Sequence, residues 1–178
     1  MTDSIEIRPI RVGDAEEIFR LIVSCRDYLA EWLPWADYTR NVRDTKDYIE
    51  ANVGKDIFSG REIFTVKYYG AIVGLIDLHG GDHLNRKAEI GYWLHEKFQG
   101  RGIMTAACKI CLDYAFNQLD LNRIVIKCVK ENLKSRNIPE RLSFSYEGLE
   151  RAGFFLKDVF RDLAVYSMLH KEWLKLYS

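Results

Sequence analysis

The chain has 178 residues, of which 48% are hydrophobic, and its 26 basic and 26 acidic side chains give a formal net charge of zero. The neutral charge argues against direct binding of nucleic acid, and the apolar runs are far shorter than the roughly 18–20 residues of a membrane span. The N-terminal segment MTDSIEIRPI lacks the apolar core of a signal peptide, which predicts a cytoplasmic protein without a membrane partner. Length and apolar content suit one compact domain, so we expect residues 1–178 to fold as a single unit.

Alternating residues at 5–9 predict a first strand, after which the pattern becomes helical. Asp14, with Glu17 three residues later, is similar to a capping box, and it opens an amphipathic helix that we expect to end near Leu33 and Pro34. The apolar face of this helix recurs with helical spacing at Ile18, Leu21, Ile22, Cys25 and Leu29. A second helix is expected from about 44 to 58.

From residue 60 onward the sequence predicts mostly strands. The runs 62–69 and 71–78 give a hairpin signal at Gly70, and a glycine loop at 80–82 separates them from a fourth strand at 86–94. The remaining expected elements are a helix at about 102–118, a strand at 122–129, a short helix at about 133–142, and strands near 144–147 and 162–169. This mixture without linkers predicts one mixed α/β domain.

Cys108 and Cys111 form a C-x-x-C pair, which raises a redox or metal-binding interpretation. The pair lies inside a helical run, whereas a redox pair is typical of a helix start that stabilises the thiolate. Neither a second C-x-x-C nor a spaced histidine pair completes a metal site, so we predict no metal and reduced, mostly buried thiols at all four cysteines.

The segment FQGRG at 98–102 places two glycines at the junction of a strand and a helix. Glycine permits left-handed backbone conformations, and the free amides of a helix start attract negative charge, so this turn suits a phosphate. The segment lacks the lysine and hydroxyl residue that end a P-loop, and it lacks the third glycine of a dinucleotide-binding turn. On the glycine pattern alone, a tight turn without any ligand remains the alternative.

The order of the elements and the turn together resemble the GNAT superfamily of acetyl-CoA-dependent N-acetyltransferases. The phosphate turn of that family reads Q/R-x-x-G-x-G/A, and Gln99, Gly102 and Met104 occupy its positions here, with Met104 departing from the small final residue. The resemblance covers nearly the whole chain and narrows to the ribosomal-protein N-acetyltransferases of the RimJ/RimL type. The segments that carry it are WLPW at 32–35, AEIGYWL at 88–94, QGRGIMT at 99–105, NLKS at 132–135, PERLSF at 139–144, DLAVYSM at 162–168 and a late Trp173.

This resemblance implies a central, mostly antiparallel twisted sheet of about seven strands, flanked by helices, in which strands four and five splay apart. It also implies acetyl-CoA as the co-substrate. The pyrophosphate would be bound by amides of the turn, at Gln99, Gly100, Arg101, Gly102, Ile103 and Met104. The pantetheine arm would contact the backbone of Tyr92, Trp93 and Leu94 and the side chain of Asn132. Two plain alternatives stay open, which are a solvated turn residue for Arg101 and a helix cap alone for Asn132.

In GNAT enzymes the amine attacks the thioester directly, so the cysteines are not required as nucleophiles. The resemblance implies that Ser135 protonates the leaving thiolate, because Pro139 stands where many GNAT enzymes carry a tyrosine acid; water is the alternative. An amide near Leu94 would polarise the thioester carbonyl. Glu89 is the candidate base, and its alternative is a surface carboxylate paired with a basic neighbour.

An α-amine has a pKa near 7.7–8, whereas a lysine amine near 10.4 is almost wholly protonated at neutral pH. Without an obvious strong base, we expect the acceptor to be the N-terminal amine of a protein, and the resemblance suggests a ribosomal protein. Trp32, Pro34 and Trp35 would form the acceptor wall, or else a core plug under the first helices. A small-molecule acceptor (a polyamine, an amino acid or an amino sugar), a non-catalytic acyl-CoA-binding module and a homo-oligomer all remain open.

Overall fold

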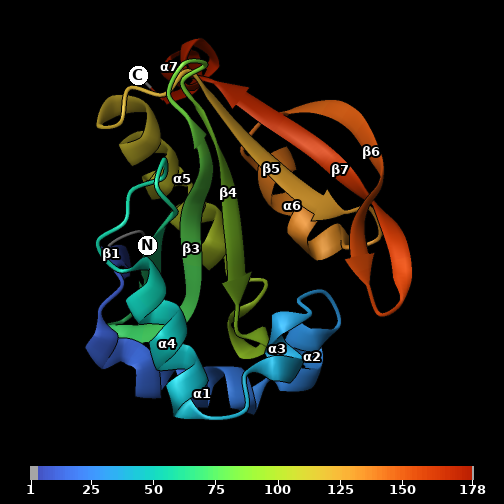
Figure 1. Cartoon of the computed structure of the whole chain (residues 1–178). Helices are drawn as coiled ribbons and strands as arrows, with labels where there is room; N and C mark the ends of the chain where they lie inside the picture. Colours follow the sequence, from blue (N-terminus) through green and yellow to red (C-terminus); the bar gives the residue numbers. More distant parts are fainter. Residues whose placement is uncertain (1–3, 178) are drawn as a thin grey trace.

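The computed structural model describes residues 4–177 and has one seven-stranded sheet at its centre (Figure 1). The strands are β1 (Ile5–Pro9), β2 (Arg61–Tyr68), β3 (Ala71–Asp82), β4 (Lys87–Leu94), β5 (Arg123–Val129), β6 (Ser145–Leu156) and β7 (Val159–Leu169). Their order across the sheet is β1-β2-β3-β4-β5-β7-β6. Every neighbouring pair is antiparallel except β4 and β5, which run parallel. The predicted fold class is therefore confirmed.

The strands β4 and β5 pair only at their beginnings. Residues 87–89 of β4 lie beside residues 123–125 of β5, and no pairing continues beyond Glu89 and Val125, although β4 runs on to Leu94. In Figure 1 the two strands start side by side and then separate. The splay that the resemblance implied is present. Because of it, the later halves of β4 and β5 make no hydrogen bonds to each other.

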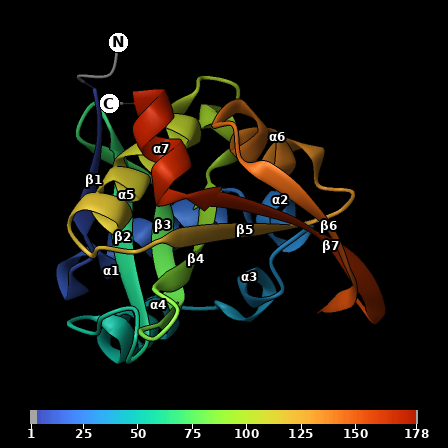
Figure 2. The same cartoon turned by 90° about the horizontal axis from the view of Figure 1, so that it is seen from above.

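Helices cover both faces of the sheet. They are α1 (Ala15–Ser24), α2 (Arg26–Ala30), α3 (Trp35–Tyr38), α4 (Val42–Asn52), α5 (Ile103–Asn117), α6 (Leu133–Arg141) and α7 (His170–Tyr177), with short 3₁₀ turns at Val12–Asp14 and Glu96–Phe98. Figure 2 shows the sheet between α5 on one side and the α1–α4 pair on the other. Between residues 4 and 177, no helix is both long and apolar enough to cross a membrane.

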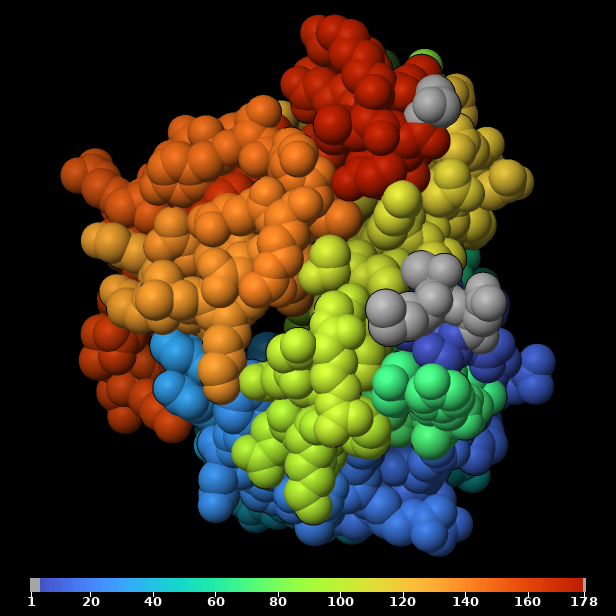
Figure 3. All heavy atoms as spheres, turned by 180° about the vertical axis from the view of Figure 1, so that it is seen from behind, coloured from blue at the N-terminus to red at the C-terminus, as the bar shows by residue number. Residues whose placement is uncertain are grey.

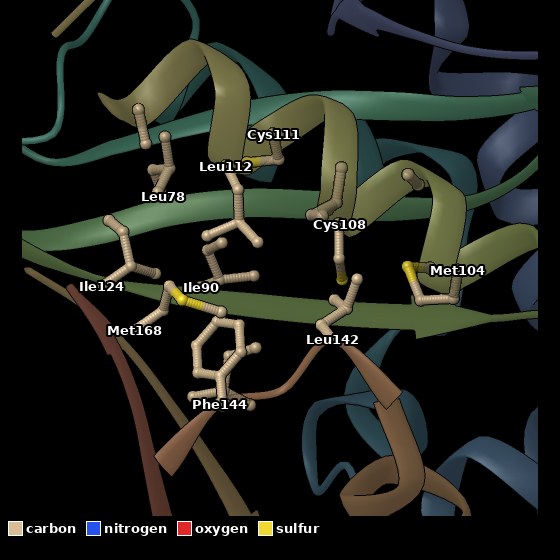
Figure 4. Packing of buried hydrophobic residues seen from close by; sticks show 14 of the residues in the cluster. Leu78, Ile90, Met104, Cys108, Cys111, Leu112, Ile124, Leu142, Phe144 and Met168 are labelled. Carbon is tan, nitrogen blue, oxygen red and sulfur yellow. The ribbon is translucent and has the colours of Figure 1, made fainter. Parts of the chain in front are cut away.

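Successive side chains of the central strands point to opposite faces of the sheet, and a hydrophobic core lies on each face. Ile63 and Leu75 pack toward α1 and α4, whereas Phe64 and Ile76 pack toward α5. In the larger core, side chains from α5 such as Leu112 lie over β3 and β4 (Figure 4). Leu112 is fully buried, so its replacement by alanine would cost roughly 2–5 kcal/mol of stability.

All four cysteines are free and buried, as predicted. Cys108 and Cys111 lie in the interior of α5 among the core side chains of Figure 4. Burial raises the pKa of the Cys108 thiol well above its ordinary value, so this thiol stays protonated and inert at neutral pH.

The N-terminal helices differ from the prediction. The single helix expected up to residue 33 breaks at Cys25, whose φ of −139° leaves the helical region, and continues as the separate helices α2 and α3. The helix expected to reach residue 58 ends at Asn52, because Gly54 adopts a φ of +76° and the side chain of Asp56 accepts hydrogen bonds from the next amides. These breaks bring α2 and α3 to the open end of β4.

The C-terminal half also differs in extent. The loop expected at 80–82 continues β3 through an irregularity between His79 and Asp82. The last two strands are longer than expected and form a hairpin from 145 to 169, while the helix α7 was not predicted at all. Most residues of β6 are exposed, so its sequence carries little of the apolar alternation on which strand prediction depends.

Candidate active site

A cavity of about 1060 Å³ opens where β4 and β5 separate. Its walls come from α2 and α3, the open end of β4, the turn before α5, the end of β5, the first turns of α6 and part of β6. Figure 3 shows its mouth as an opening between the light-blue, yellow-green and orange segments of the surface. Cavities of this size are typical of sites for a small molecule or cofactor.

The cavity gathers nearly all the site residues that the sequence predicted. Those that line it are Glu89, Tyr92, Trp93, Leu94, Gln99, Gly100, Gly102, Ile103, Met104, Asn132 and Ser135. Arg101 is not among the lining residues. Its side chain is exposed, and its guanidinium carbon lies 5.7 Å from the centroid of the Phe98 ring. The Arg101 side chain is therefore solvated, as expected under the alternative interpretation in which it does not contact the phosphates.

The turn before α5 has the geometry of an anion site. Gly100 and Gly102 adopt φ angles of +71° and +74°, and a Cβ at either position would meet nothing within 4 Å. The glycines are thus needed for backbone conformation rather than for space. The cap position of α5 is Gly102, no side chain caps this helix start, and its first turn holds no acidic residue. Free amides and the positive end of the helix dipole together favour a phosphate here.

Two residues that the sequence analysis missed lie beside this turn. The side-chain amide of Gln99 donates a hydrogen bond to the hydroxyl of Tyr28, which ties α2 to the turn. The ammonium of Lys134, in the first turn of α6, lies 5.2 Å from the centroid of the Tyr28 ring, and both side chains line the cavity. Lys134 places a positive charge near the turn. No spacing rule could have found it, because Tyr28 and Lys134 are brought together only by the fold.

Ser135 lies in a cluster of hydroxyl and thiol groups. Asn132 caps α6 by accepting a hydrogen bond from the amide of Ser135 at 3.1 Å, as its structural alternative predicted. The Ser135 hydroxyl donates to the Tyr92 hydroxyl at 3.3 Å and lies 3.2 Å from the sulfur of Cys128. The Tyr92 hydroxyl in turn donates to the Ser135 carbonyl at 2.9 Å.

This cluster is uncharged at neutral pH. Burial raises the pKa of Tyr92 well above its ordinary value, and burial likewise raises the pKa of the Cys128 thiol. Position 139 holds a buried proline within α6, so no tyrosine is available there. Tyr92 instead brings a phenol to Ser135 from β4, which the sequence did not reveal because residues 92 and 135 are far apart in the chain.

A row of charged side chains crosses the other part of the cavity. Asp77 accepts from Arg61 at 3.0 Å, the Nδ1 atom of His79 lies 2.7 Å from Asp77, and the Nε2 atom of His79 lies 3.9 Å from Glu89. The ammonium of Lys127 then lies 3.2 Å from Glu89 and 3.0 Å from Glu150. All of these side chains except Asp77 line the cavity. Glu89 therefore has the basic partner that its alternative interpretation expected, while it also faces the cavity.

Lys127 keeps its charge in this row. Burial works to lower the pKa of Lys127, but hydrogen bonds and charges from Glu150 and Glu89 outweigh that effect and raise it above the usual lysine value. Lys127 is therefore an ammonium at neutral pH and cannot serve as a base.

The aromatic segment of α2 and α3 forms one wall of the cavity. Trp32, Pro34 and Trp35 all line it. Trp35 is 37% exposed, and its ring lies 5.9 Å from the ring of Trp93 on β4. This exposure is inconsistent with a core plug at Trp35, and its contact with the acceptor stays a prediction.

Comparison with known proteins gives the family. Residues 4–145 match the model of the acetyltransferase (GNAT) domain, and the chain belongs to this family. It is 38% identical over 175 residues to the "Putative ribosomal N-acetyltransferase YdaF" of Bacillus subtilis strain 168, covering 97% of this chain and 95% of that protein. It is 27% identical over 169 residues to the ribosomal-protein-serine acetyltransferase of Escherichia coli K12, covering 95% and 94% of the two chains.

Among solved structures, the chain is similar to the microcin C7 self-immunity acetyltransferase MccE in complex with acetyl-CoA and AMP. The TM-score is 0.89 at 30% identity, covering 94% of this chain and 93% of that one. The chain is an acetyl-CoA-dependent N-acetyltransferase, and acetyl-CoA is its co-substrate. The cavity fits this co-substrate, because it combines an uncapped helix start for phosphates with an open strand edge. Among the described residues, 4–177, no cluster of side chains suits a metal ion.

Proposed function

We propose that the protein transfers the acetyl group of acetyl-CoA to the N-terminal amine of a protein, and that this acceptor is a ribosomal protein in the cytoplasm. The relatives just described support the acceptor class. The observation that carries the proposal is the acceptor side of the cavity, where an aromatic wall adjoins a charged row in which the cations Arg61 and Lys127 are already paired with carboxylates. Three carboxylates and two cations leave this row with one net negative charge, because Lys127 is shared by Glu89 and Glu150. That charge matches the single ammonium group of a peptide N-terminus better than the several ammonium groups of a polyamine.

On the donor side, we assign the pyrophosphate to the amides of Gly100, Gly102, Ile103 and Met104, with the ammonium of Lys134 nearby. The free edge of β4 at Tyr92, Trp93 and Leu94 binds the pantetheine arm, and an amide near Leu94 polarises the thioester carbonyl. We leave Arg101 out of this site because its side chain stacks outside the cavity. Holding both substrates in one cavity allows direct attack, and orientation alone lowers the barrier substantially.

The leaving thiolate needs a proton, and Ser135 is the donor that we assign. Ser135 lines the cavity, and its hydroxyl is hydrogen-bonded to a neutral phenol. When Ser135 gives up its proton, the Tyr92 hydroxyl can donate to the serine oxygen in its place. The pair therefore supplies a proton without leaving an isolated alkoxide in the cavity.

A small-molecule amine is the second candidate acceptor. The observation that favours it is the similarity over 94% of the chain to MccE, a self-immunity acetyltransferase whose structure holds AMP as well as acetyl-CoA. The two candidates differ in the molecule that contacts the aromatic wall, which is a peptide in the first case and a compact amine in the second.

A thiol-release assay with acetyl-CoA separates the two candidates. The panel contains N-terminal peptides of ribosomal proteins, N-terminally blocked lysine peptides, spermidine, amino acids and amino sugars. We expect kcat/KM for at least one N-terminal peptide to exceed that of every small amine by about tenfold or more, which corresponds to about 1.4 kcal/mol. A small amine that exceeds all the peptides by that margin would replace the first candidate with the second.

A further inference from the structure

A carboxylate and an imidazole form a pair on β3 at the acceptor side of the cavity. Asp77 is only 8% exposed, and its two oxygens accept hydrogen bonds from the Arg61 guanidinium at 3.0 and 3.1 Å. The Nδ1 atom of His79 lies 2.7 Å from the same carboxylate, and the His79 side chain is 28% exposed. The imidazole is thus held from one side and open to the cavity on the other.

The pair fixes which ring nitrogen of His79 can act as a base. A carboxylate bound to a guanidinium only accepts hydrogen bonds, so Nδ1 must carry the hydrogen that it shares with Asp77. The neutral ring then has its lone pair on Nε2. This nitrogen lies 3.9 Å from the nearer Glu89 oxygen, which is too long for a hydrogen bond. The Nε2 atom is therefore free to accept a proton.

The opposite strand leaves this pair uncovered. Gly91 of β4 lies in register with Asp77, and Glu89 lies in register with His79. A Cβ at position 91 would lie 3.0 Å from an oxygen of Asp77 and 3.4 Å from Cε1 of His79. The absence of a side chain there leaves His79 open to the cavity at the point where β4 leaves β5, while Asp77 stays buried behind it. Trp93, two residues farther along the same strand face, continues this surface into the aromatic wall.

Glu89 is less available than His79 to accept a proton. One of its oxygens is engaged by the Lys127 ammonium at 3.2 Å, and that ammonium is shared with Glu150. The other oxygen is directed toward His79. Its position suits the stabilisation of a positive charge on the acceptor or on the imidazole.

We propose that His79, oriented by Asp77, takes the proton from the acceptor amine, and that Glu89 stabilises the resulting imidazolium. The proposal rests on acetyl transfer to an amine, and it does not depend on whether that amine belongs to a ribosomal protein. His79 is a catalytic residue in this account because it touches the acceptor, and Asp77 is a positioning residue.

The protons and bonds balance as follows. His79 Nε2 accepts one proton from the acceptor ammonium, whose freed lone pair forms the new N–C bond with the thioester carbonyl carbon. The C–S bond breaks and its electron pair leaves on sulfur. The thiolate acquires one proton from Ser135, and the second nitrogen proton, which is lost as the amide forms, returns through water to the Ser135 oxygen. His79 then releases its proton to water, so that one acetyl group moves and one net proton is released.

Several titratable or charged groups surround His79 and contribute to its pH dependence. They are Asp77 on β3, Arg61 on β2, Glu89 on β4, Lys127 on β5, Glu150 on β6 and Tyr48 on α4, which interacts with Asp77 and Arg61. A pH profile therefore has to be compared between variants rather than interpreted from one protein.

The kinetic test is His79→Gln, measured with whichever amine is the most active in the panel. At about pH 6.5, where an α-amine of pKa near 7.7–8 is mostly protonated, we expect kcat to fall about 10²–10⁴-fold. The loss should shrink as the pH approaches about 9, because the amine then arrives deprotonated. The matched control is His83→Gln, which alters an exposed histidine outside the cavity lining and should keep the wild-type profile. Wild-type kcat in His79→Gln, or a loss that is equal at both pH values, would overturn the proposal.

A second measurement needs no substrate and can fail independently of the proposed function. Nitrogen-15 NMR of the imidazole rings should show His79 in the Nδ1–H tautomer in the folded protein, and Asp77→Asn should shift it toward Nε2–H, because an amide can donate to Nδ1. The same variant should lower kcat while leaving the KM for acetyl-CoA nearly unchanged. An Nε2–H tautomer in the wild-type protein, or an unchanged tautomer with unchanged kcat in Asp77→Asn, would contradict the assigned roles.

Discussion

The ammonium of Lys127 lies 3.2 Å from Glu89 at the point where β4 and β5 stop pairing. The same ammonium is 3.0 Å from Glu150, so two carboxylates share one cation on the acceptor side of the cavity and one net negative charge remains. This balance bears directly on which amines can bind, because an acceptor brings its own positive charge into the row.

Replacing Lys127 with methionine should therefore change acceptor preference. The change leaves two carboxylates without their shared cation, so we expect the KM for spermidine to fall about fivefold or more, while the KM for an N-terminal peptide changes less. Steady-state kinetics with both acceptors measures this. The control Lys171→Met alters an exposed lysine on α7, remote from the cavity. An equal change for both acceptors would argue against the charge balance as a selectivity device.

Gly102→Asp should weaken acetyl-CoA binding, because it adds a negative charge at the start of α5 where the pyrophosphate is assigned. We expect the dissociation constant from calorimetry to rise by at least about tenfold, or about 1.4 kcal/mol. Gly102→Asn has a side chain of the same shape, also tolerates a left-handed φ, and should weaken binding much less. Gly54→Asp, at another glycine with positive φ, controls for the cost in stability. Equal affinity in the aspartate and asparagine variants would remove the phosphate from this turn.

Ser135→Ala should lower kcat with little effect on acetyl-CoA binding, since we assign its hydroxyl to the protonation of the leaving thiolate. We expect a loss of about 10²-fold, and a smaller loss in Tyr92→Phe, which keeps the serine and removes only the phenol that supports it. The loss in the double variant should be less than the product of the two single losses, because the residues act as one unit. Fully independent effects would show that Tyr92 does not support Ser135.

Acid stability should depend on Glu147, which joins β6 to β5. Hydrogen bonds from Arg123 at 2.7 and 2.6 Å, with a further one from Ser167, lower the pKa of Glu147 from 4.5 to about 2. Because the pKa is lowered on folding, the stabilisation is fully present above about pH 4.5 and is lost as the pH falls toward 2. Glu147→Gln should therefore lower the melting temperature at pH 7 and have a vanishing effect near pH 2.

The comparison for this prediction is Glu16→Gln, which changes an exposed carboxylate on α1. The Glu147 side chain is 39% exposed, so solvent screening keeps the effect modest. A melting-temperature difference for Glu147→Gln that stays constant from pH 7 to about pH 2 would contradict the role of this ion pair.

Local sequence signals predicted the elements whose burial is regular. The apolar alternation of β2 and β3, the positive-φ glycines before α5 and the Asn132 cap all correspond to features visible in a short segment. The break at Cys25 could not be predicted this way, because tertiary packing bends the chain there. The length of the β6–β7 hairpin could not be predicted either, because β6 is largely exposed.

For the candidate site, the geometry of the glycine turn before α5 was predictable, and the contacts around it were less so. Motif positions pointed to Glu89 and Ser135, which both line the cavity, whereas their partners Lys127 and Tyr92 are set by strand register and splay. His79 gave no sequence signal, since its role depends on Asp77 two residues earlier and on the bare backbone of Gly91 opposite.

The acceptor assignment is tested most directly by two matched peptides incubated with acetyl-CoA. One has a free N-terminus and no lysine, and the other has a blocked N-terminus and one lysine; mass spectrometry then locates the acetyl group. The account predicts acetylation of the free N-terminus alone, because its amine has a pKa near 7.7–8 whereas that of lysine is near 10.4. Acetylation of the lysine peptide alone, or transfer to spermidine with neither peptide modified, would contradict it.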